Sequence, residues 1–430
     1  MSKKILIITY YWPPSGGSGV QRWLYFSRFL AKLGWDPIII TVDHEEASYP
    51  VIDKSLLKLS KEIRTIKTST REPLRIYSKL KTGNIREGIP QGQIDNSSFL
   101  KRLSSFIRGN FFIPDARKGW NKFAVKAAKY IIENEEINYI ITTGPPHSTH
   151  LIGLELIKKY SIKWLADFRD PWSEIFYTKD LHRLSCFQKK DEKLEKKVLS
   201  SASAILTTTG GDFHKLLRNK INTSQYFFTI NNGFDKELLD SISSEKPNFF
   251  HIVYTGLLTE NHSYKMVIKS IDEISKKYPK ESIKFSLAGK IDKSIVSELK
   301  IKLPNVLVEY KGYLEHSQAI LLMKSAHLLL NFIFKNADSY MISGKTLEYM
   351  ASNVPILCVG KEKTPVSKLL LKGTESIVVL KNDFDKTYLF INQLTDAWSN
   401  GVSKTNLVSD INNFSRKELT KKLNFILKSL

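Results

Sequence analysis

A chain of 430 residues is too long for a single hydrophobic core, so we expect two domains, or three. Its 42% hydrophobic and 11% aromatic content excludes a chain that is disordered over most of its length. The 65 lysines and arginines exceed the 43 aspartates and glutamates, and the resulting net charge of +22 indicates an anionic partner. That partner is a nucleic acid, an acidic membrane surface or a phosphorylated small molecule.

The cysteines and the apolar runs restrict the class of protein further. Cys186 and Cys358 have no C-x-x-C partner, which argues against a secreted disulfide scaffold and against a cysteine zinc site. The first apolar run, residues 5–10, is too short for a signal-peptide core, and no window approaches about 20 apolar residues. We therefore expect a cytoplasmic protein, either soluble or peripheral on the inner face of the cytoplasmic membrane.

The first half of the chain alternates short apolar runs with longer stretches of helical period. Runs at 5–9, 37–42, 139–143 and 164–168 are typical of buried parallel strands, and residues 20–33 carry one broad apolar stripe typical of a helix. This alternation predicts a layered α/β domain.

A lysine- and arginine-rich stretch at residues 54–111 interrupts that pattern. It is either a set of solvated helix faces with a long surface loop, or a basic amphipathic surface that rests on an anionic membrane and helps to seat a lipid-linked substrate.

The strand pattern restarts after residue 247, with runs at 249–254, 283–288, 305–310, 326–334 and 354–359. We therefore predict an N-terminal domain over 1–235, a polar linker over 236–246 and a second α/β domain over 247–405. Residues 406–430 are predicted to form a helical tail that packs near the junction of the domains.

A glycine-rich loop separates the first strand from the first helix. Gly17, Ser18 and Gly19 stand where backbone N–H groups and the positive end of a helix dipole can bind a diphosphate. The spacing is not G-x-G-x-x-G, so a dinucleotide fingerprint fits poorly, and a purely structural turn remains an alternative.

A second phosphate-binding pattern occurs at residues 343–348. Ser343, Gly344 and Lys345 resemble the end of a P-loop, but the earlier glycine that a P-loop needs is replaced by Ser339. The amides and the lysine suit a diphosphate, and Glu348 in the following helix suits a ribose or sugar diol. A solvated carboxylate near the helix start is the alternative for Glu348.

Taken together, the motifs resemble family 4 glycosyltransferases of the GT-B type over almost the whole chain. The resemblance rests on YWPPSGGSG (11–19), IPD (113–115) with Trp120, TGPPH (143–147), ADFRDPW (166–172), NNGFD (231–235), YTG (254–256), LAG (287–289) and GKTLEYMA (344–351) with Pro355. It implies two Rossmann-like domains that face each other across a cleft. It also implies transfer of a sugar from a nucleotide diphosphate sugar, most commonly a UDP sugar, with retention at the anomeric carbon and without a bound metal or other cofactor.

The resemblance assigns roles in the second domain, with two departures from the family pattern. Glu348 corresponds to the later member of a glutamate pair and is expected to hold the nucleotide ribose, while the earlier position is Tyr340. This departure matches a branch that acts in surface polysaccharide assembly, and either Tyr340 or Asp338 would then replace the missing glutamate. The turn at Gly312 and Tyr313 is expected to contact the base, or to be an ordinary turn.

The second departure concerns the cations that neutralise the leaving diphosphate. An arginine common after Gly256 is replaced by Leu257, which leaves Lys265, Lys290 and Lys345 to supply positive charge. Fixed cations and helix N-termini stabilise the charge that develops on the diphosphate in the transition state. Ordinary surface lysines are the alternative for Lys265 and Lys290.

The first-domain candidates follow two strands. His147 is expected to contact the donor sugar at the reaction centre, because family members often use a histidine from this region. His150, Arg169, Asp170 and Trp172 stand near the carboxyl ends of the same strands, where α/β domains build their sites, and are predicted to bind the acceptor or the sugar. An internal Arg169–Asp170 ion pair is the structural alternative.

These observations predict a glycosyltransferase that acts on a lipid-linked saccharide in capsule, O-antigen or other envelope polysaccharide synthesis, at an anionic membrane surface. A nucleotide-sugar epimerase of the same fold is the first alternative. A nucleic-acid-binding protein is the second, although the chain has no zinc finger or RNA-recognition signature, and we expect no nucleic acid partner.

Overall fold

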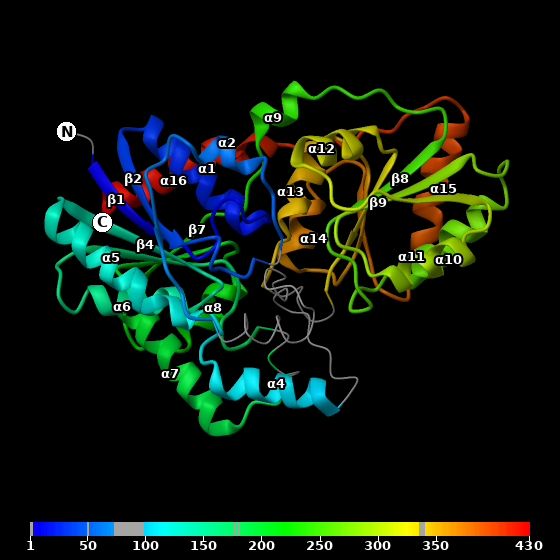
Figure 1. The fold of residues 1–430 in the computed structure, drawn as a ribbon. Coiled ribbons are helices and arrows are strands. Elements are labelled where there is room, and N and C mark those ends of the chain that lie inside the picture. Colours follow the sequence, from blue (N-terminus) through cyan, green and yellow to red (C-terminus); the bar gives the residue numbers. More distant parts are fainter. Residues whose placement is uncertain (1–2, 50, 73–98, 176–177, 179–180, 335–339) are drawn as a thin grey trace. The chain divides into compact units, whose positions relative to one another are not determined.

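The computed structural model describes residues 3–49, 51–72, 99–175, 178, 181–334 and 340–430. The chain forms two units, Met1–Asn231 with Leu419–Leu430, and Asn232–Glu418, each with its own parallel sheet (Figure 1). The predicted pair of Rossmann-like α/β domains is confirmed in this respect.

The first unit contains a seven-stranded sheet in the order β3-β2-β1-β4-β5-β6-β7. Its strands are β1 (Lys3–Ile8), β2 (Trp35–Val42), β3 (Thr65–Thr68), β4 (Ile137–Gly144), β5 (Lys163–Phe168), β6 (Ala204–Thr207) and β7 (Tyr226–Thr229). All described pairs are parallel; Ile7 on β1, for example, lies beside Ile39 of β2 and Ile141 of β4. The central strands are long apolar runs because both faces of the sheet are covered.

This unit also contains a 3-10 turn at Lys118–Trp120. Its helices are α1 (Ser18–Lys32), α2 (Leu56–Ser60), α4 (Phe99–Phe111), α5 (Asn121–Asn134), α6 (Ser148–Leu156), α7 (Ser185–Ser201) and α8 (Asp212–Arg218). Trp23 and Phe26 of α1 are buried against the sheet, as the predicted apolar stripe requires. The strands at β3, β6 and β7 were not predicted, because they are short and, for β3, lie within the basic stretch.

The second unit repeats the architecture with a six-stranded sheet in the order β10-β9-β8-β11-β12-β13. The strands are β8 (Phe250–Thr255), β9 (Ile283–Ala288), β10 (Val306–Tyr310), β11 (Leu328–Phe332), β12 (Ile356–Val359) and β13 (Ser376–Val379). The helices are α9 (Lys236–Ser241), α10 (Lys265–Ser275), α11 (Lys293–Lys302), α12 (His316–Ser325), α13 (Gly344–Ala351), α14 (Pro365–Leu370) and α15 (Phe384–Ser399), with a 3-10 turn at Ile411–Phe414.

The chain leaves and re-enters the first unit at positions that differ from the predicted boundaries. The division falls between Asn231 and Asn232, and part of the segment expected as a linker forms helix α9. The C-terminal helix α16 (Arg416–Ser429) returns Leu419, Leu423, Ile426 and Leu427 to the core of the first unit. The tail is therefore part of that unit's core.

Among the described residues, no helix combines the length and apolar character that crossing a bilayer requires.

Candidate functional site

The candidate residues of the first unit gather where the strand order reverses. β2 and β3 lie on one side of β1 and β4 to β7 lie on the other, so the carboxyl ends of β1 and β4 flank the switch point at which open α/β sheets bind ligands. The backbone N–H of Arg169, after β5, donates to the carbonyl of Gly144 at the end of β4, at 3.0 Å. This bond joins the two loops that carry His147 and Trp172.

His147 lies at the start of α6 and is buried, with 6% of its surface exposed. Its ring stacks on Trp172 with ring centroids 5.1 Å apart and an interplanar angle of 9°. Neither ring nitrogen has a hydrogen bond of good geometry in the described structure. Burial, helped by the positive charge of Arg169, lowers the pKa of His147 well below its usual value. His147 is therefore a neutral imidazole at physiological pH, and both of its ring nitrogens are buried.

His150 lies beneath His147 in the same stack of rings. Its ring stacks on Phe168 with centroids 4.6 Å apart, and its Nδ1 lies 2.9 Å from Oγ1 of Thr142. Burial lowers its pKa to about 3. Gly144 is required beside the pair, because a Cβ there would lie 2.7 Å from a ring nitrogen of His150 and 2.8 Å from one of His147. A sugar-binding role for His150 stays a prediction.

Arg169 connects the loop after β4 with the start of α1. Its guanidinium donates hydrogen bonds to the carbonyls of Gly144 and Pro145, and a Cβ at Gly19 would overlap its Nη1 atom at 1.5 Å. The glycine is therefore needed for a cation to approach the helix start. Burial lowers the pKa of Arg169 and raises that of Asp170.

Helix α1 begins at this place without a side-chain cap. Gly17, with φ of 102°, is its N-cap residue and provides no side-chain cap. Its carbonyl accepts hydrogen bonds from the N–H groups of Val20 and Gln21 at 3.1 and 3.2 Å, so only the two earlier amides of the helix, those of residues 18 and 19, remain as candidates to bind an anion. The side chain of Ser18 lies outside the described part of the structure. The glycine loop and Arg169 thus place amides and one cation together, as a diphosphate site requires.

A cavity of about 70 Å³ opens beside His147 and Trp172. Asp115, on its wall, accepts hydrogen bonds from the backbone N–H and the hydroxyl of Ser148, both at 2.8 Å, and burial raises the pKa of this carboxyl. Arg117 also lines the cavity and pairs with Glu72. An indole, a neutral imidazole, a carboxyl group and a guanidinium are the groups that hold sugar hydroxyls.

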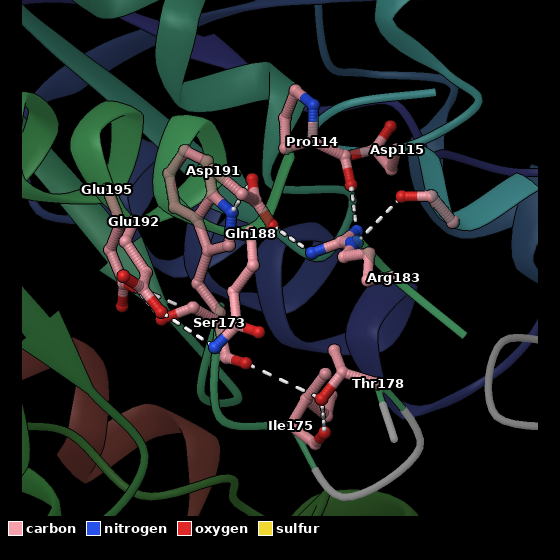
Figure 2. Close-up of polar contacts among 12 residues, drawn as sticks. Pro114, Asp115, Ser173, Ile175, Thr178, Arg183, Gln188, Asp191, Glu192 and Glu195 are labelled. Carbon is pink, nitrogen blue, oxygen red and sulfur yellow. Dashed lines mark hydrogen bonds and ion pairs between the residues drawn. The ribbon is translucent and has the colours of Figure 1, made fainter. Parts of the chain in front are cut away.

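Two buried carboxylates on α7 hold the loop that carries Trp172, and sequence reasoning missed both. Nε1 of Trp172 donates to Oδ1 of Asp191 at 2.8 Å, and Arg183 pairs with Oδ2 of the same residue. One turn along the helix, Glu195 accepts hydrogen bonds from the backbone N–H and hydroxyl of Ser173, as Figure 2 shows. Two successive loop residues are therefore fixed by one face of α7.

A weak signal for these carboxylates was present in the sequence. Asp191 and Glu195 share the helix face of Phe187 and Val198, so the helical period places both among apolar positions. Burial raises the pKa of Glu195 to about 7, although Lys220, at 2.7 Å, opposes the shift. The surrounding lysine-rich sequence hid this pattern.

The second unit presents three glycine turns at the carboxyl edge of its sheet. Gly256, Gly289 and Gly312 follow β8, β9 and β10 with φ of 124°, 110° and 68°, a region that disfavours side chains. A Cβ at Gly289 would lie 2.3 Å from the Gly256 carbonyl oxygen, and the Gly289 N–H donates to the Gly312 carbonyl at 2.7 Å. The turns thus form a layer of exposed backbone, close to which a ligand can approach.

Lys345 lies in the first turn of α13, beside this layer. Its Nζ is 3.9 Å from the ring centroid of Tyr254, and a Cβ at Gly256 would lie 3.7 Å from that nitrogen. Burial lowers the pKa of Lys345 to about 7. Ser343, at the N-cap, makes no capping hydrogen bond and instead lies 2.8 Å from the Thr346 hydroxyl. Lys345 therefore lies beside the glycine turns, in the same first helical turn as Gly344, and the binding of a diphosphate by these residues stays a prediction.

Glu348 is held by a histidine and an arginine rather than solvated. One carboxylate oxygen lies 2.8 Å from Nε2 of His316 and 3.6 Å from Arg416. Burial acts to raise the pKa of Glu348, but His316 and Arg416 outweigh it, and the net shift is downward. The carboxylate is ionised and fixed, which is the state that accepts hydrogen bonds from a diol.

The remaining predicted donor residues are exposed at the surface. Lys265 and Lys290 are exposed, and 52% of the Tyr313 surface is accessible to solvent. Tyr340 is half-buried, and Asp338 lies outside the described residues. The roles of these residues stay predictions.

Comparison with known proteins agrees with this arrangement. Residues 250–396 match the family described as glycosyl transferases group 1. Sucrose-phosphate synthase from Thermosynechococcus elongatus superposes with a TM-score of 0.64 at 14% identity, over 99% of this chain and 98% of that one. No curated protein sequence gives a significant match.

Two further solved structures are similar over nearly their whole length. Anabaena HepE, in complex with UDP, gives a TM-score of 0.62 at 12% identity and covers 99% of this chain and 100% of its own. The lipopolysaccharide outer core galactosyltransferase WaaB gives 0.57 at 13% identity, with 99% and 100% covered. The chain thus has the fold of these structures across both units.

Proposed function

We propose that this chain is a retaining family 4 glycosyltransferase. A GT-B fold and a glycosyl transferase group 1 domain together support a glycosyltransferase enzyme, and the proposal starts from them. It transfers a sugar from a nucleotide diphosphate sugar to a lipid-linked saccharide, in capsule, O-antigen or other envelope polysaccharide synthesis. The observation that carries the proposal is the group 1 match over 250–396, because this segment contains the glycine turns, Lys345 and Glu348.

The donor is proposed to bind along the carboxyl edge of the second sheet. The diphosphate meets the first-turn amides of α13 and Nζ of Lys345, and the ribose meets the ionised carboxylate of Glu348. The turn at Gly312 is assigned to the base. A uridine nucleotide is favoured by the UDP and UDP-glucose complexes of HepE, whose fold this chain shares.

The reaction exchanges one bond for another at the anomeric carbon. The bond to the diphosphate oxygen breaks, and the acceptor oxygen bonds to the same carbon on the same face. The acceptor proton passes to an oxygen of the departing diphosphate. Negative charge grows on the diphosphate as it leaves, so Lys345 and the helix amides stabilise the transition state more than the ground state. These groups are proposed to act without a metal ion.

His147 is proposed to contact the reacting sugar. Its neutral ring can donate a hydrogen bond from one nitrogen and accept at the other, and Trp172 fixes the plane of the ring. The adjoining cavity, with Asp115 and Arg117, is assigned to the saccharide acceptor.

A transfer assay tests the proposal. Thermal shifts across a panel of nucleotide sugars identify the donor, since a ligand at 100 times its dissociation constant adds about 2.7 kcal/mol of stability. Donor consumption is then followed with and without a polyprenyl diphosphate saccharide, and nuclear magnetic resonance defines the anomeric configuration of the product. Isomerised nucleotide sugar formed without acceptor would instead identify the epimerase alternative.

Donor binding has a matched pair of variants. Glu348→Ala removes the proposed ribose contact and is expected to weaken donor affinity about tenfold or more in calorimetry, because a hydrogen bond to a charged group is lost. Glu315→Ala, an exposed carboxylate at the start of α12, is expected to leave donor affinity unchanged. Equal affinities of both variants would remove Glu348 from the donor site.

A further inference from the structure

Helix α4 carries an exposed apolar stripe on the first unit. Leu103, Ile107 and Phe111 recur every four residues, on one side of the helix, and are 44%, 41% and 68% exposed. Single exposed apolar residues are common, but a continuous row of large ones on one helix marks a surface that contacts something apolar.

The remaining sides of α4 are firmly attached to the protein. Ser105 is buried, and Gly109 packs so closely on Leu181 that a Cβ would lie 2.5 Å from its carbonyl oxygen. The side chain of Asn110 donates to the carbonyl of His182 at 3.2 Å and accepts from the N–H of Leu184 at 2.7 Å. The exposed stripe is thus a fixed feature of a docked helix.

The surroundings of the stripe are basic. Arg102 is exposed on α4. Helix α7 lies next to α4 (Figure 1). The rings of Phe111 and Phe187 join the two helices, with centroids 5.9 Å apart. The exposed face of α7 carries Lys189, Lys190, Lys193, Lys196 and Lys197. An apolar stripe next to a helix with exposed cations complements a surface that is apolar inside and anionic outside, as a bilayer with acidic lipids is.

The same helix also reaches the cavity beside His147. Arg108 on α4 and Phe112, just after it, line that cavity, while Ile107 and Phe111 face solvent. A single helix therefore connects the proposed acceptor cavity with the exposed apolar stripe. A ligand with a saccharide head and a lipid tail has matching contacts on the two sides of α4.

We infer that α4 is the membrane-docking element of this protein, with Leu103, Ile107 and Phe111 inserted among the acyl chains of an anionic bilayer and the basic residues of α4 and α7 at the headgroups. The inference names the membrane-contacting surface and rests on the proposed function in so far as the acceptor is lipid-linked. It assigns the stripe to lipid, rather than to a second copy of the chain or to another protein.

Vesicle sedimentation tests the inference with the full chain. Wild-type protein is expected to bind vesicles of phosphatidylcholine with one-third phosphatidylglycerol, and more weakly when salt is added. The triple variant Leu103→Ser, Ile107→Ser, Phe111→Ser is expected to bind these vesicles with an affinity lower by a factor of about ten or more, because its apolar contacts are lost. The control triple variant Ile301→Ser, Leu389→Ser, Phe425→Ser removes apolar residues elsewhere that are more exposed than those of α4, and it is expected to bind like wild type.

Equal vesicle binding by wild type and the α4 triple variant would overturn the inference, as would absence of wild-type binding. The inference would also be overturned if the wild-type protein did not bind vesicles but formed a concentration-dependent dimer, and if the α4 variant abolished that dimer. Calorimetry with UDP-glucose distinguishes failure of the docking inference from failure of the proposed function. Unchanged donor binding by the α4 variant shows that its donor site is intact, whereas vesicle binding without any nucleotide-sugar binding would refute the function and leave the docking surface standing.

Discussion

His147 has an arrangement that folding alone would not favour. A buried polar group without a hydrogen bond costs about 1 to 3 kcal/mol, and both nitrogens of this ring lack a bond of good geometry. A bound sugar hydroxyl would offset that cost. The neighbouring His150, in contrast, uses Nδ1 to bind Thr142. The two imidazoles are thus chemically different although they are three residues apart.

Replacement of His147 by alanine should lower kcat about 10- to 100-fold and leave donor affinity nearly unchanged, because one hydrogen bond made at the reaction centre is lost. Steady-state kinetics and calorimetry with the donor measure the two effects. His147→Gln, which keeps a hydrogen-bonding side chain, should recover part of the activity. A fully active alanine variant would move the reaction centre elsewhere.

Lys345 gives donor binding a pH dependence. Its pKa is about 7 in the free protein because burial disfavours the charged form. A diphosphate prefers the charged lysine, so affinity for UDP-glucose should be constant below pH 7 and fall as pH rises above it. Binding at pH 8 should therefore take up a proton.

Calorimetry in buffers of different ionisation enthalpy measures this proton uptake. The exposed residue Lys300 on α11 provides a matched control. Lys345→Met should abolish both the uptake and the pH dependence above 7, while Lys300→Met keeps both. Proton uptake that survives in Lys345→Met would assign the titration to another group.

At the scale of the element, helix α7 acts as a support for the reaction site. Its carboxylates at 191 and 195 bind Trp172 and Ser173, and Trp172 in turn stacks on His147. A helix with lysines outside and two carboxylates inside therefore sets the position of a ring that touches the proposed substrate.

The substitution Asp191→Ala should lower kcat about tenfold, since Trp172 and Arg183 lose their shared partner and His147 loses a fixed neighbour. It should also destabilise the first unit by about 3 kcal/mol or more, because a buried guanidinium is left unpaired. Asp191→Asn keeps the acceptor for Trp172 and should retain more activity than the alanine variant. Steady-state kinetics measures the change in kcat, and denaturant unfolding measures the loss of stability.

Glu192→Ala is the control on the same helix. Glu192 accepts a hydrogen bond from the side chain of Gln188 at 2.9 Å, on the exposed part of α7, and its replacement is expected to leave kcat unchanged. If Asp191→Ala and Glu192→Ala have the same kcat, then α7 does not position the reaction site.

At the scale of the whole molecule, the first unit is completed by the last residues of the chain. Leu419, Leu423, Ile426 and Leu427 of α16 pack with residues of β1 and α1, and Asn424 accepts a hydrogen bond from Trp35 at 2.8 Å. The first unit therefore acquires its full core only when the end of the chain is present.

Leu423→Ala should destabilise the first unit by about 2 to 5 kcal/mol, because it leaves a cavity at a position with no exposed surface. Differential scanning calorimetry would detect the lower transition temperature. Phe425→Ala, at a position on the same helix that is 73% exposed, should shift the transition little. Equal shifts in both variants would contradict the prediction, because they would show that the buried and exposed faces of α16 contribute equally to stability.

Local patterns in the sequence determined the alternation of strands and helices, the two α/β units and the glycine turns. These features depend on side-chain periodicity and on backbone conformation within a few residues. Gly256 and Gly289 stand in motifs of the family resemblance, and Gly312 received its expected role from the same resemblance; the positive φ at each explains physically why glycine occurs there.

Only the tertiary structure decided which polar groups meet. It joined Arg169 to the carbonyls of Gly144 and Pro145, paired Glu348 with His316 and Arg416, and buried two carboxylates of a lysine-rich helix. It also separated the neutral, unpaired His147 from His150. Burial and hydrogen-bond partners come from residues distant in the chain, and no local period of the sequence encodes them.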